Sequence, residues 1–483
     1  MNPKHLLIAT VLFSILLAAC GGGAPTTIAQ YPAATQAPVY ISPVTVEAES
    51  GAVPTAAAYA APAPTAPADM FFQDYGVNPY VSTDADHLST FALDVDTASY
   101  TVVRRYLDDG NMPPADAVRV EEFVNYFDQD YANPPDVAFG LYADGAPSPF
   151  TRDGTHILRF GIQGYDVPDN ERKPASLTFV IDVSGSMAQE NRLELVKRSL
   201  ELLVERLRPS DTVAIVVYGS EARVVLNPTS GEDMGAILNA IYSLQTEGAT
   251  NAEAGLRLGY EIANRAYRPD GINRVILCSD GVANVGVTGP DALSEFIRGY
   301  ADAGITLTTM GFGMGNFNDT LMEQLADNGD GNYAYVDDLD EARRLFIDNL
   351  TSTLQVIALN AKVQVDFNGD VVARYRLIGY ENRAVADSDF RNNDVDAGEI
   401  GAGHTVTALY AVQLKPGAEG RIAAVALRWE DPDTHEVKEI DGNFHTFDLA
   451  KSFDDASLRY QLDVVVAQFA EVLRQSPYAE GAP

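Results

Sequence analysis

Between residues 176 and 336 the sequence alternates short apolar runs with amphipathic stretches, and this alternation restricts the possible folds more than any other feature. The first run, residues 177–181 (LTFVI), is apolar at every position, which is typical of a strand covered on both faces. Residues 192–207 then repeat leucine and valine at helical spacing. Such alternation builds a parallel sheet with helices on both sides. We therefore predict a doubly wound α/β domain over residues 171–355.

The pattern continues to the end of this domain. Further strands are predicted at residues 213–218, 223–226, 275–278, 307–311 and 333–336. Helices are predicted between them, at residues 232–244, 251–266, 291–303 and 318–327, with a last one at 339–354.

Hydroxyl and carboxyl side chains follow the first strand at its carboxyl end, in the run DVSGS at residues 182–186. Thr250 precedes a predicted helix, and Asp280 follows a later strand. Ligand sites in open parallel sheets form beyond the carboxyl ends of the strands, so these residues should lie together. Their hard oxygen donors suit Mg²⁺, or alternatively Mn²⁺ or Ca²⁺, better than Zn²⁺. We predict a metal site made by Asp182, Ser184, Ser186, Thr250 and Asp280.

The spacing DxSxS, a later GxTN and a strand-end DG resemble the metal-ion-dependent adhesion site of von Willebrand factor type A domains. The resemblance covers residues 175–355. It implies that the three hydroxyls coordinate the metal and that the two aspartates bind it directly or through water. It also implies that a protein partner offers an Asp or Glu carboxylate as a further ligand. The alternative is a turn whose Ser and Asp side chains only cap backbone groups.

The first residues have the form of a targeting signal. Residues 1–19 combine Lys4 and His5 with an apolar run of secretory length, which is short for a membrane span. Residues 17–20 (LAAC) resemble the lipobox of bacterial lipoproteins, which implies cleavage before Cys20 and lipidation of its thiol. We expect a lipid anchor on the extracytoplasmic face of the cell membrane or the outer membrane. A plain signal peptide with an incidental cysteine is the alternative.

The composition of residues 20–70 predicts an extended tether. They are rich in Ala, Pro and Thr and contain no Lys or Arg, so they cannot bury enough apolar surface to fold. A segment of this kind holds a folded part away from the lipid surface.

Two regions flank the α/β domain. Residues 71–170 predict a small α+β region. Residues 356–483 return to a period of two and predict a β-sandwich, with strands from residues 137–167 as candidates to join it. A closing helix is predicted at residues 457–473.

Four segments resemble the uncharacterised bacterial YfbK-type lipoproteins, namely residues 89–100 (STFALDVDTASY), 113–127 (PPADAVRVEEFVNYF), 373–383 (ARYRLIGYENR) and 396–410 (DAGEIGAGHTVTALY). Nearly the whole chain after the tether is covered. This resemblance implies the fold and a metal site, and it implies no known activity.

Charge and cysteine content exclude several classes of protein. Lys and Arg number 33 against 68 Asp and Glu, so the formal net charge is −35. Such a charge repels phosphate backbones and anionic lipid, which disfavours nucleic acid as a partner. The cysteines are Cys20 and Cys278, which excludes a disulfide framework. Cys278 falls in a buried strand pattern and is expected to be an unreactive core thiol.

These observations favour a non-catalytic envelope lipoprotein that binds a protein partner through a divalent metal. The histidines show no HExxH spacing, and Ser184 and Ser186 lie outside any GxSxG motif. Two alternatives stay open. One is a structural scaffold in which the metal only stabilises the fold, and the other is a metal-assisted hydrolase.

Several other patterns receive plainer interpretations. Residues 311–315 (GFGMG) predict a tight turn after a strand rather than a nucleotide-binding loop. Residues 327–332 (DNGDGN) predict a hairpin-like turn, and residues 392–396 (NNDVD) a surface loop. A solvated face is expected for the basic residues on and just after the first helix of the α/β domain: Arg192, Lys197, Arg198, Arg206 and Arg208.

Overall fold

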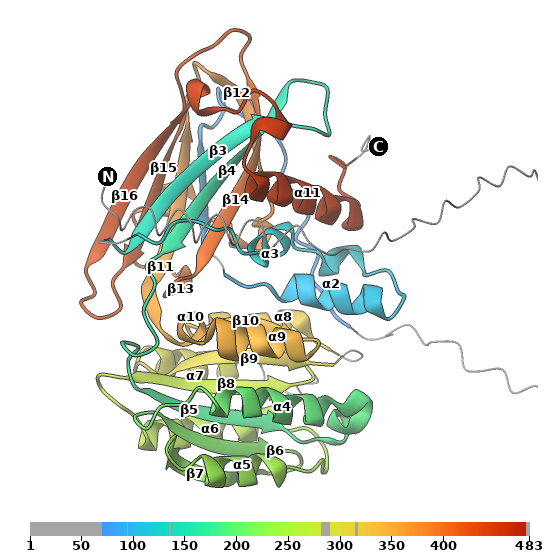
Figure 1. Cartoon of the computed structure of the whole chain (residues 1–483), viewed down its shortest axis with the longest axis vertical. Helices are drawn as coiled ribbons and strands as arrows, with labels where there is room; N and C mark the ends of the chain where they lie inside the picture. Colours follow the sequence, from blue (N-terminus) through green and yellow to red (C-terminus); the bar gives the residue numbers. More distant parts are fainter. Residues whose placement is uncertain (1–69, 94, 135–136, 282–289, 314–316, 480–483) are drawn as a thin grey trace, which may run out of the picture. The chain divides into compact units, whose positions relative to one another are not determined.

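The computed structural model describes residues 70–93, 95–134, 137–281, 290–313 and 317–479. They form an α/β domain and an antiparallel β-sandwich (Figure 1). The predicted signal peptide, Cys20 and all but the last residue of the predicted tether lie outside these residues. Within the described part of the chain, no helix combines the length and the apolar character that crossing a bilayer requires.

The α/β domain is built on one sheet with the strand order β10-β9-β8-β5-β6-β7. Its strands are β5 (Ala175–Asp182), β6 (Thr212–Tyr218), β7 (Ala222–Ser230), β8 (Ile272–Ser279), β9 (Thr306–Phe312) and β10 (Tyr333–Val336). All neighbours run parallel except β7, which closes one edge antiparallel to β6. β5 is central and buried along its whole length, as its continuous apolar run predicts. The predicted doubly wound fold is confirmed.

Helices cover both faces of this sheet. One face carries α4 (Arg192–Val204), α5 (Met234–Tyr242), α9 (Leu339–Arg343) and α10 (Leu350–Leu354). The other carries α6 (Ala252–Arg265), α7 (Pro290–Ala301), α8 (Asp319–Asp327) and α2 (Ala98–Asp108). Successive residues of β5 serve the two cores in turn, because Phe179 and Ile181 face one side and Val180 the other. The single helix predicted at residues 339–354 is interrupted by a π-helical segment, Arg344–Asp348.

The β-sandwich contains two antiparallel sheets. The first is β1 (Val81–Ser82), β12 (Val372–Ile378), β14 (Thr405–Leu414), β4 (Thr155–Gly164) and β3 (Phe139–Pro147). The second is β13 (Gly398–Gly401), β11 (Val356–Phe367), β15 (Arg421–Glu430) and β16 (Val437–His445), with β2 (Leu88–Ala92) beside β11. Strands from before the α/β domain therefore pair with strands from after it, such as β4 with β14.

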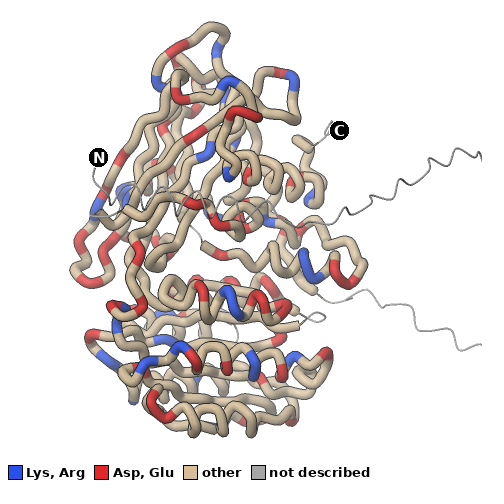
Figure 2. The backbone as a smooth tube through the Cα atoms, in the orientation of Figure 1, with Lys and Arg blue, Asp and Glu red and all other residues tan. Residues whose placement is uncertain are grey.

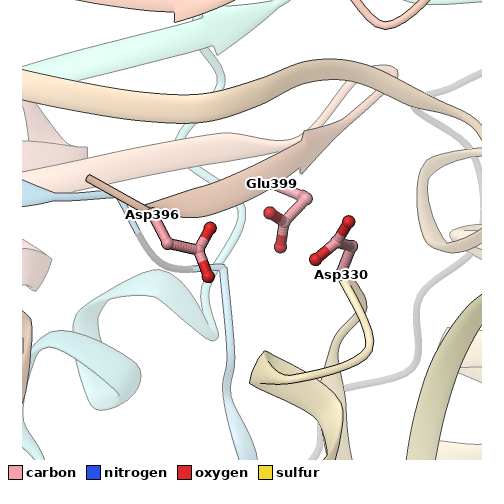
Figure 3. A group of neighbouring side chains, drawn as sticks. All are labelled: Asp330, Asp396 and Glu399. Atoms are coloured by element: carbon pink, nitrogen blue, oxygen red, sulfur yellow. The ribbon is translucent and has the colours of Figure 1, made fainter. Parts of the chain in front are cut away.

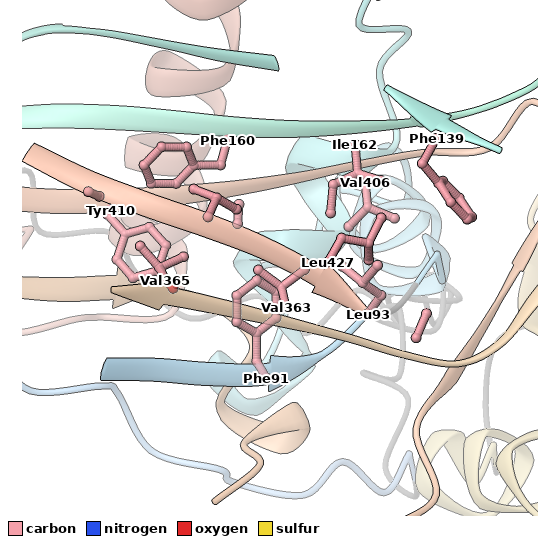
Figure 4. Close-up of a cluster of buried hydrophobic side chains, with 14 of the residues drawn as sticks. Phe91, Leu93, Phe139, Phe160, Ile162, Val363, Val365, Val406, Tyr410 and Leu427 are labelled. Carbon is pink, nitrogen blue, oxygen red and sulfur yellow. The ribbon is translucent and has the colours of Figure 1, made fainter. Parts of the chain in front are cut away.

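Aromatic and branched side chains from the two sheets meet in one core (Figure 4). Phe91 and Val363 approach it from the second sheet, and Phe160 and Tyr410 from the first. Two helices, α11 (Leu458–Leu473) and α3 (Val120–Asn125), cover the outer face of the first sheet with a smaller apolar cluster. α11 is the predicted closing helix.

Candidate metal centre

The end of β5 brings three of the predicted ligands together. Asp182 is the last residue of β5, and its side chain is buried. The Ser184 amide donates to Asp182 Oδ1 at 2.7 Å, which turns the chain directly after the strand. The hydroxyl oxygens of Ser184 and Ser186 lie 3.0 Å apart. The DxSxS spacing thus gathers one carboxylate and two hydroxyls at the carboxyl edge of the sheet.

Asp280 comes to the same edge because it follows β8, the parallel neighbour of β5. It is buried, like Asp182. Ser279 Oγ donates to Asp182 Oδ2 at 3.2 Å, which links the two strand ends and was not anticipated from the sequence. Gly281 follows with a φ of +78°, and a Cβ there would lie 2.3 Å from the Phe317 ring. Only glycine permits this exit from the strand.

The loop that carries Thr250 is tied to the exit of β5 by its backbone. The Glu247 amide donates to the Val183 carbonyl at 2.5 Å, and the Gly185 amide donates to the Gly248 carbonyl at 3.2 Å. Thr250 itself is partly exposed. Among the described residues, its hydroxyl makes no hydrogen bond with the other four predicted ligands. Backbone contacts therefore tie this third loop to the exit of β5, and the Ala249 amide also donates to Ser220 Oγ at 3.0 Å.

The electrostatics of the strand edge suit a cation. Burial is the main cause that raises the pKa of Asp182 to about 6, and the Asp280 carboxylate raises it further. Hydrogen bonds from Ser184 and Ser279 act in the opposite direction. Two neighbouring buried carboxylates repel each other, and a bound divalent ion would remove that repulsion. Because the donors are all oxygens, the residues present fit Mg²⁺.

The predicted solvated face is wrong for Arg192. The residue is only 4% exposed, and its Nη1 donates to Asp280 Oδ2 at 2.8 Å. As the first residue of α4 it points back toward the sheet, because side chains on a helix tilt toward the amino end. Gly313 permits this approach, since a Cβ there would lie 2.3 Å from Arg192 Nε. Arg198 and Arg206 are exposed, as predicted.

Two plainer predictions concern strand residues near this edge. Cys278 is buried in β8, and burial raises the pKa of its thiol far above the ordinary value, as an unreactive core thiol requires. β9 ends at Phe312, and Gly313 turns the chain with a φ of +83°. Residues 314–316 of the predicted turn lie outside the described part of the chain.

A second cluster of acidic side chains comes from two segments that are far apart in the sequence. Asp330, from the turn between α8 and β10, meets Asp396 and Glu399 from the start of β13 (Figure 3). Carboxylate oxygens of the three residues lie within 4.8 Å of one another. Burial raises the pKa of Asp330 to about 6 and that of Glu399 far above its ordinary value. Asp330 precedes β10, so this cluster lies at the amino edge of the sheet, opposite to the predicted ligands.

Comparisons with known proteins cover most of the described chain. Residues 176–351 match the family model of the von Willebrand factor type A domain, residues 66–159 match a model described as von Willebrand factor, and residues 352–421 match the C-terminal model of the uncharacterized protein YfbK. The chain is 36% identical over 440 residues to the uncharacterized protein YfbK of Escherichia coli, covering 85% of this chain and 75% of that protein.

More distant relatives match a smaller part of the chain. Inter-alpha-trypsin inhibitor heavy chain H3 of Homo sapiens is 29% identical over 182 residues, which cover 36% of this chain and 20% of that protein. Among solved structures, a von Willebrand factor type A protein from Catenulispora acidiphila aligns with a TM-score of 0.42 at 17% identity, covering 66% of this chain and 75% of that chain.

Proposed function

Because the chain belongs to the YfbK family and contains a von Willebrand factor type A domain, we propose that it binds a protein partner through a divalent cation at the carboxyl edge of its α/β sheet. The observation that carries this proposal is the convergence of Asp182, Ser184 and Ser186 beside the buried Asp280. These side chains come from two adjacent strand ends, which are joined by the Ser279–Asp182 hydrogen bond.

In this proposal the metal is held by Asp182, Ser184, Ser186, Thr250 and Asp280. Mg²⁺ is the first candidate, with Mn²⁺ and Ca²⁺ as alternatives, because all of these ions prefer oxygen ligands. When bound, the metal supplies a Lewis-acidic position for an Asp or Glu carboxylate of the partner. The turn after β5 orients the two serine hydroxyls, and backbone contacts tie the loop that carries Thr250 to the exit of β5.

Arg192 strengthens the case for an acidic partner. Asp182 and Asp280 carry two negative charges when ionised, which balance a divalent ion, and Arg192 adds one positive charge at 2.8 Å from Asp280. The loaded site would therefore be positive. Acidic residues occur throughout both parts of the protein (Figure 2), and the net charge of −35 opposes an acidic partner at long range. At physiological salt the screening length is about 8 Å, so this opposition slows the approach more than it weakens the contact.

We also propose that the site binds rather than catalyses. Residues 171–355 contain no histidine, the commonest general base near neutral pH. The Ser184 amide and the Ser279 hydroxyl donate hydrogen bonds to Asp182, and Arg192 donates one to Asp280. These contacts hold the carboxylates in place and supply no group to accept a proton from water.

The proposed location is a lipid anchor at Cys20 on the extracytoplasmic face of the cell membrane or the outer membrane. The support is the sequence of residues 1–20, with its apolar run and LAAC motif. Cys20→Ala should move the protein from the membrane fraction to the soluble fraction and abolish labelling with a radioactive fatty acid. Labelling that persists in this variant would contradict the proposal.

The test of the function uses Thr250→Ala, with Thr250→Ser as the matched control that keeps the hydroxyl. Loss of one ligand should weaken metal binding about 10- to 100-fold in calorimetry and leave the fold unchanged. Proteins captured from envelope extracts with Mg²⁺ should be lost on chelation and in Thr250→Ala, and retained in Thr250→Ser. Equal capture by both variants and by chelated protein would favour the structural scaffold instead.

A further inference from the structure

A pocket of about 320 Å³ lies between α11 and the outer face of the sheet formed by β4, β12 and β14. It shares no residue with the predicted metal centre. Its floor is apolar, with Ile157, Ile378 and Leu409 from the three strands, and α11 adds Val464 and Ala467. A volume of this size accommodates a compact group such as a phenyl ring with a short chain.

A buried cation lines this pocket. Arg376 on β12 is 4% exposed and lies among the lining residues. Its Nη2 makes a long hydrogen bond of 3.4 Å to Glu471 Oε2. Its Nε and Nη1 have no hydrogen-bond partner among the described residues. Buried guanidinium donors are costly to leave unpaired, so the arrangement favours a ligand that accepts hydrogen bonds at this point.

Glu471 does not satisfy Arg376 by itself, because Glu471 is also paired with Arg474. Burial alone would raise the pKa of Glu471, but Arg376 and Arg474 hold it below the ordinary value. Arg474 also pairs with Glu381, whereas Arg376 has, among the described residues, only its long hydrogen bond to Glu471. A ligand carboxylate supplies the acceptor that Arg376 Nη1 lacks, whereas a dianion would be repelled more strongly by Glu471 and by Asp153 in the same pocket.

Two aromatic rings form the outer wall next to Arg376. The Tyr478 ring lies over the guanidinium, with its centroid 4.3 Å from Cζ. The Tyr80 ring meets the Tyr478 ring edge-on, with 5.5 Å between centroids. Tyr478 is 37% exposed and follows α11, so this wall borders solvent. Aromatic walls over an apolar floor suit a flat apolar group.

We propose that this pocket binds a monocarboxylate with a compact apolar body. The carboxylate accepts a hydrogen bond from Arg376 Nη1, and the apolar body lies on Ile157, Leu409 and Val464. Two sources carry this chemistry, a free small acid and the C-terminal residue of a peptide. Binding needs no metal, so this proposal and the proposed function can fail independently.

The first test is calorimetry of the full-length chain in EDTA with 3-phenylpropionate. Its neutral isostere, 3-phenylpropanamide, isolates the contribution of the charge. We expect a Kd for the acid on the order of 0.1–1 mM and an amide that binds at least about 10-fold more weakly. Equal binding of acid and amide, or no binding of the acid at tenfold that concentration, would overturn the proposal.

Variants test whether the acid binds in this pocket. Arg376→Met should abolish the preference for the acid, whereas Arg421→Met, which removes an exposed arginine from β15, should leave it unchanged. Gln468→Trp places a bulky ring among the lining residues without removing a charge, and it should abolish binding even if Arg376→Met fails to fold. Unchanged binding of the acid in Gln468→Trp would place the ligand elsewhere and sink the proposal.

A second pair of probes distinguishes the sources. The tripeptide Ala-Ala-Phe is compared with the same peptide amidated at its C-terminus. Binding of the free peptide at least as tightly as the acid assigns the site to chain ends. Binding of the acid but not of the peptide assigns it to free small acids. Both results support the proposal, and equal binding of the two peptides contradicts it.

Discussion

At the scale of single residues, the central result is that the buried Arg192 forms an ion pair with Asp280, one of the predicted metal ligands. Arg192 pairs with Asp280 through Nη1 and Oδ2, in a setting where both side chains are buried. A buried carboxylate without a positive partner is strongly unfavourable. Arg192 and a divalent ion therefore relieve the same excess of negative charge, one permanently and the other when bound.

This shared role predicts the behaviour of Arg192→Met. Without metal, the variant should lose about 3 kcal/mol of stability, because the buried Asp280 loses its ion pair with Arg192. Mg²⁺ should recover part of that loss, so the metal should stabilise the variant more than the natural protein. The measurement is urea unfolding in EDTA and in saturating Mg²⁺.

Arg198→Met is the control for this experiment, because Arg198 lies on the same helix and is exposed. It should change the free energy of unfolding by less than about 0.5 kcal/mol in either buffer. An equal loss for Arg192→Met with and without Mg²⁺ would show that the metal and the arginine do not act on the same carboxylate.

At the scale of elements, helix α6 approaches the sheet closely because glycines face it. A Cβ at Gly255 would lie 2.5 Å from the Tyr218 ring, and a Cβ at Gly259 would lie 2.3 Å from Val180 Cγ2. Glycine lowers the intrinsic stability of a helix interior. Here the close packing of α6 on β5 and β6 outweighs that cost.

Gly259→Ala should therefore destabilise the protein by about 1–3 kcal/mol, despite the better helix propensity of alanine. Gly299→Ala is the matched control in α7, where an added Cβ meets no atom within 4 Å. It should stabilise the protein by about 0.5–1 kcal/mol. Thermal and urea unfolding measure both changes, and a gain in stability for Gly259→Ala would contradict the packing argument.

At the scale of the whole molecule, buried and partly buried ion pairs connect segments that are far apart in the chain. Arg119, just before α3, donates to Asp319 of α8 at 2.8 Å and also pairs with Glu122. Arg383, which follows β12, donates to Glu323 of α8 at 3.1 Å. Helix α8 of the α/β domain is thereby tied to segments that precede and follow that domain.

Arg119→Met should cost about 3–5 kcal/mol, because it leaves Asp319 and Glu122 buried without their common partner. Urea unfolding measures this loss. Arg421→Met, which removes an exposed arginine, should change the free energy of unfolding by less than about 0.5 kcal/mol. A similarly small change for Arg119→Met would show that the buried network adds little to the cohesion of the molecule.

The candidate site could be predicted in part because its geometry is mostly local. The turn after β5 needs only the spacing of Asp182, Ser184 and Ser186, and Asp280 follows from the pairing of β8 with β5. The Arg192–Asp280 pair escaped prediction because it depends on how α4 begins against the sheet edge. Amphipathic periodicity places a helix but does not orient the side chain of its first residue.

The sequence by itself determined the α/β domain, since continuous apolar strands alternating with amphipathic helices have few stable arrangements. It also determined the oxygen-rich residues at the strand ends, because residue order follows from the chain. Only the tertiary structure decided that β4 pairs with β14 across the inserted domain, and that Asp330 meets Asp396 and Glu399. Such contacts join residues far apart in the chain, and their stability comes from packing, which no local pattern encodes.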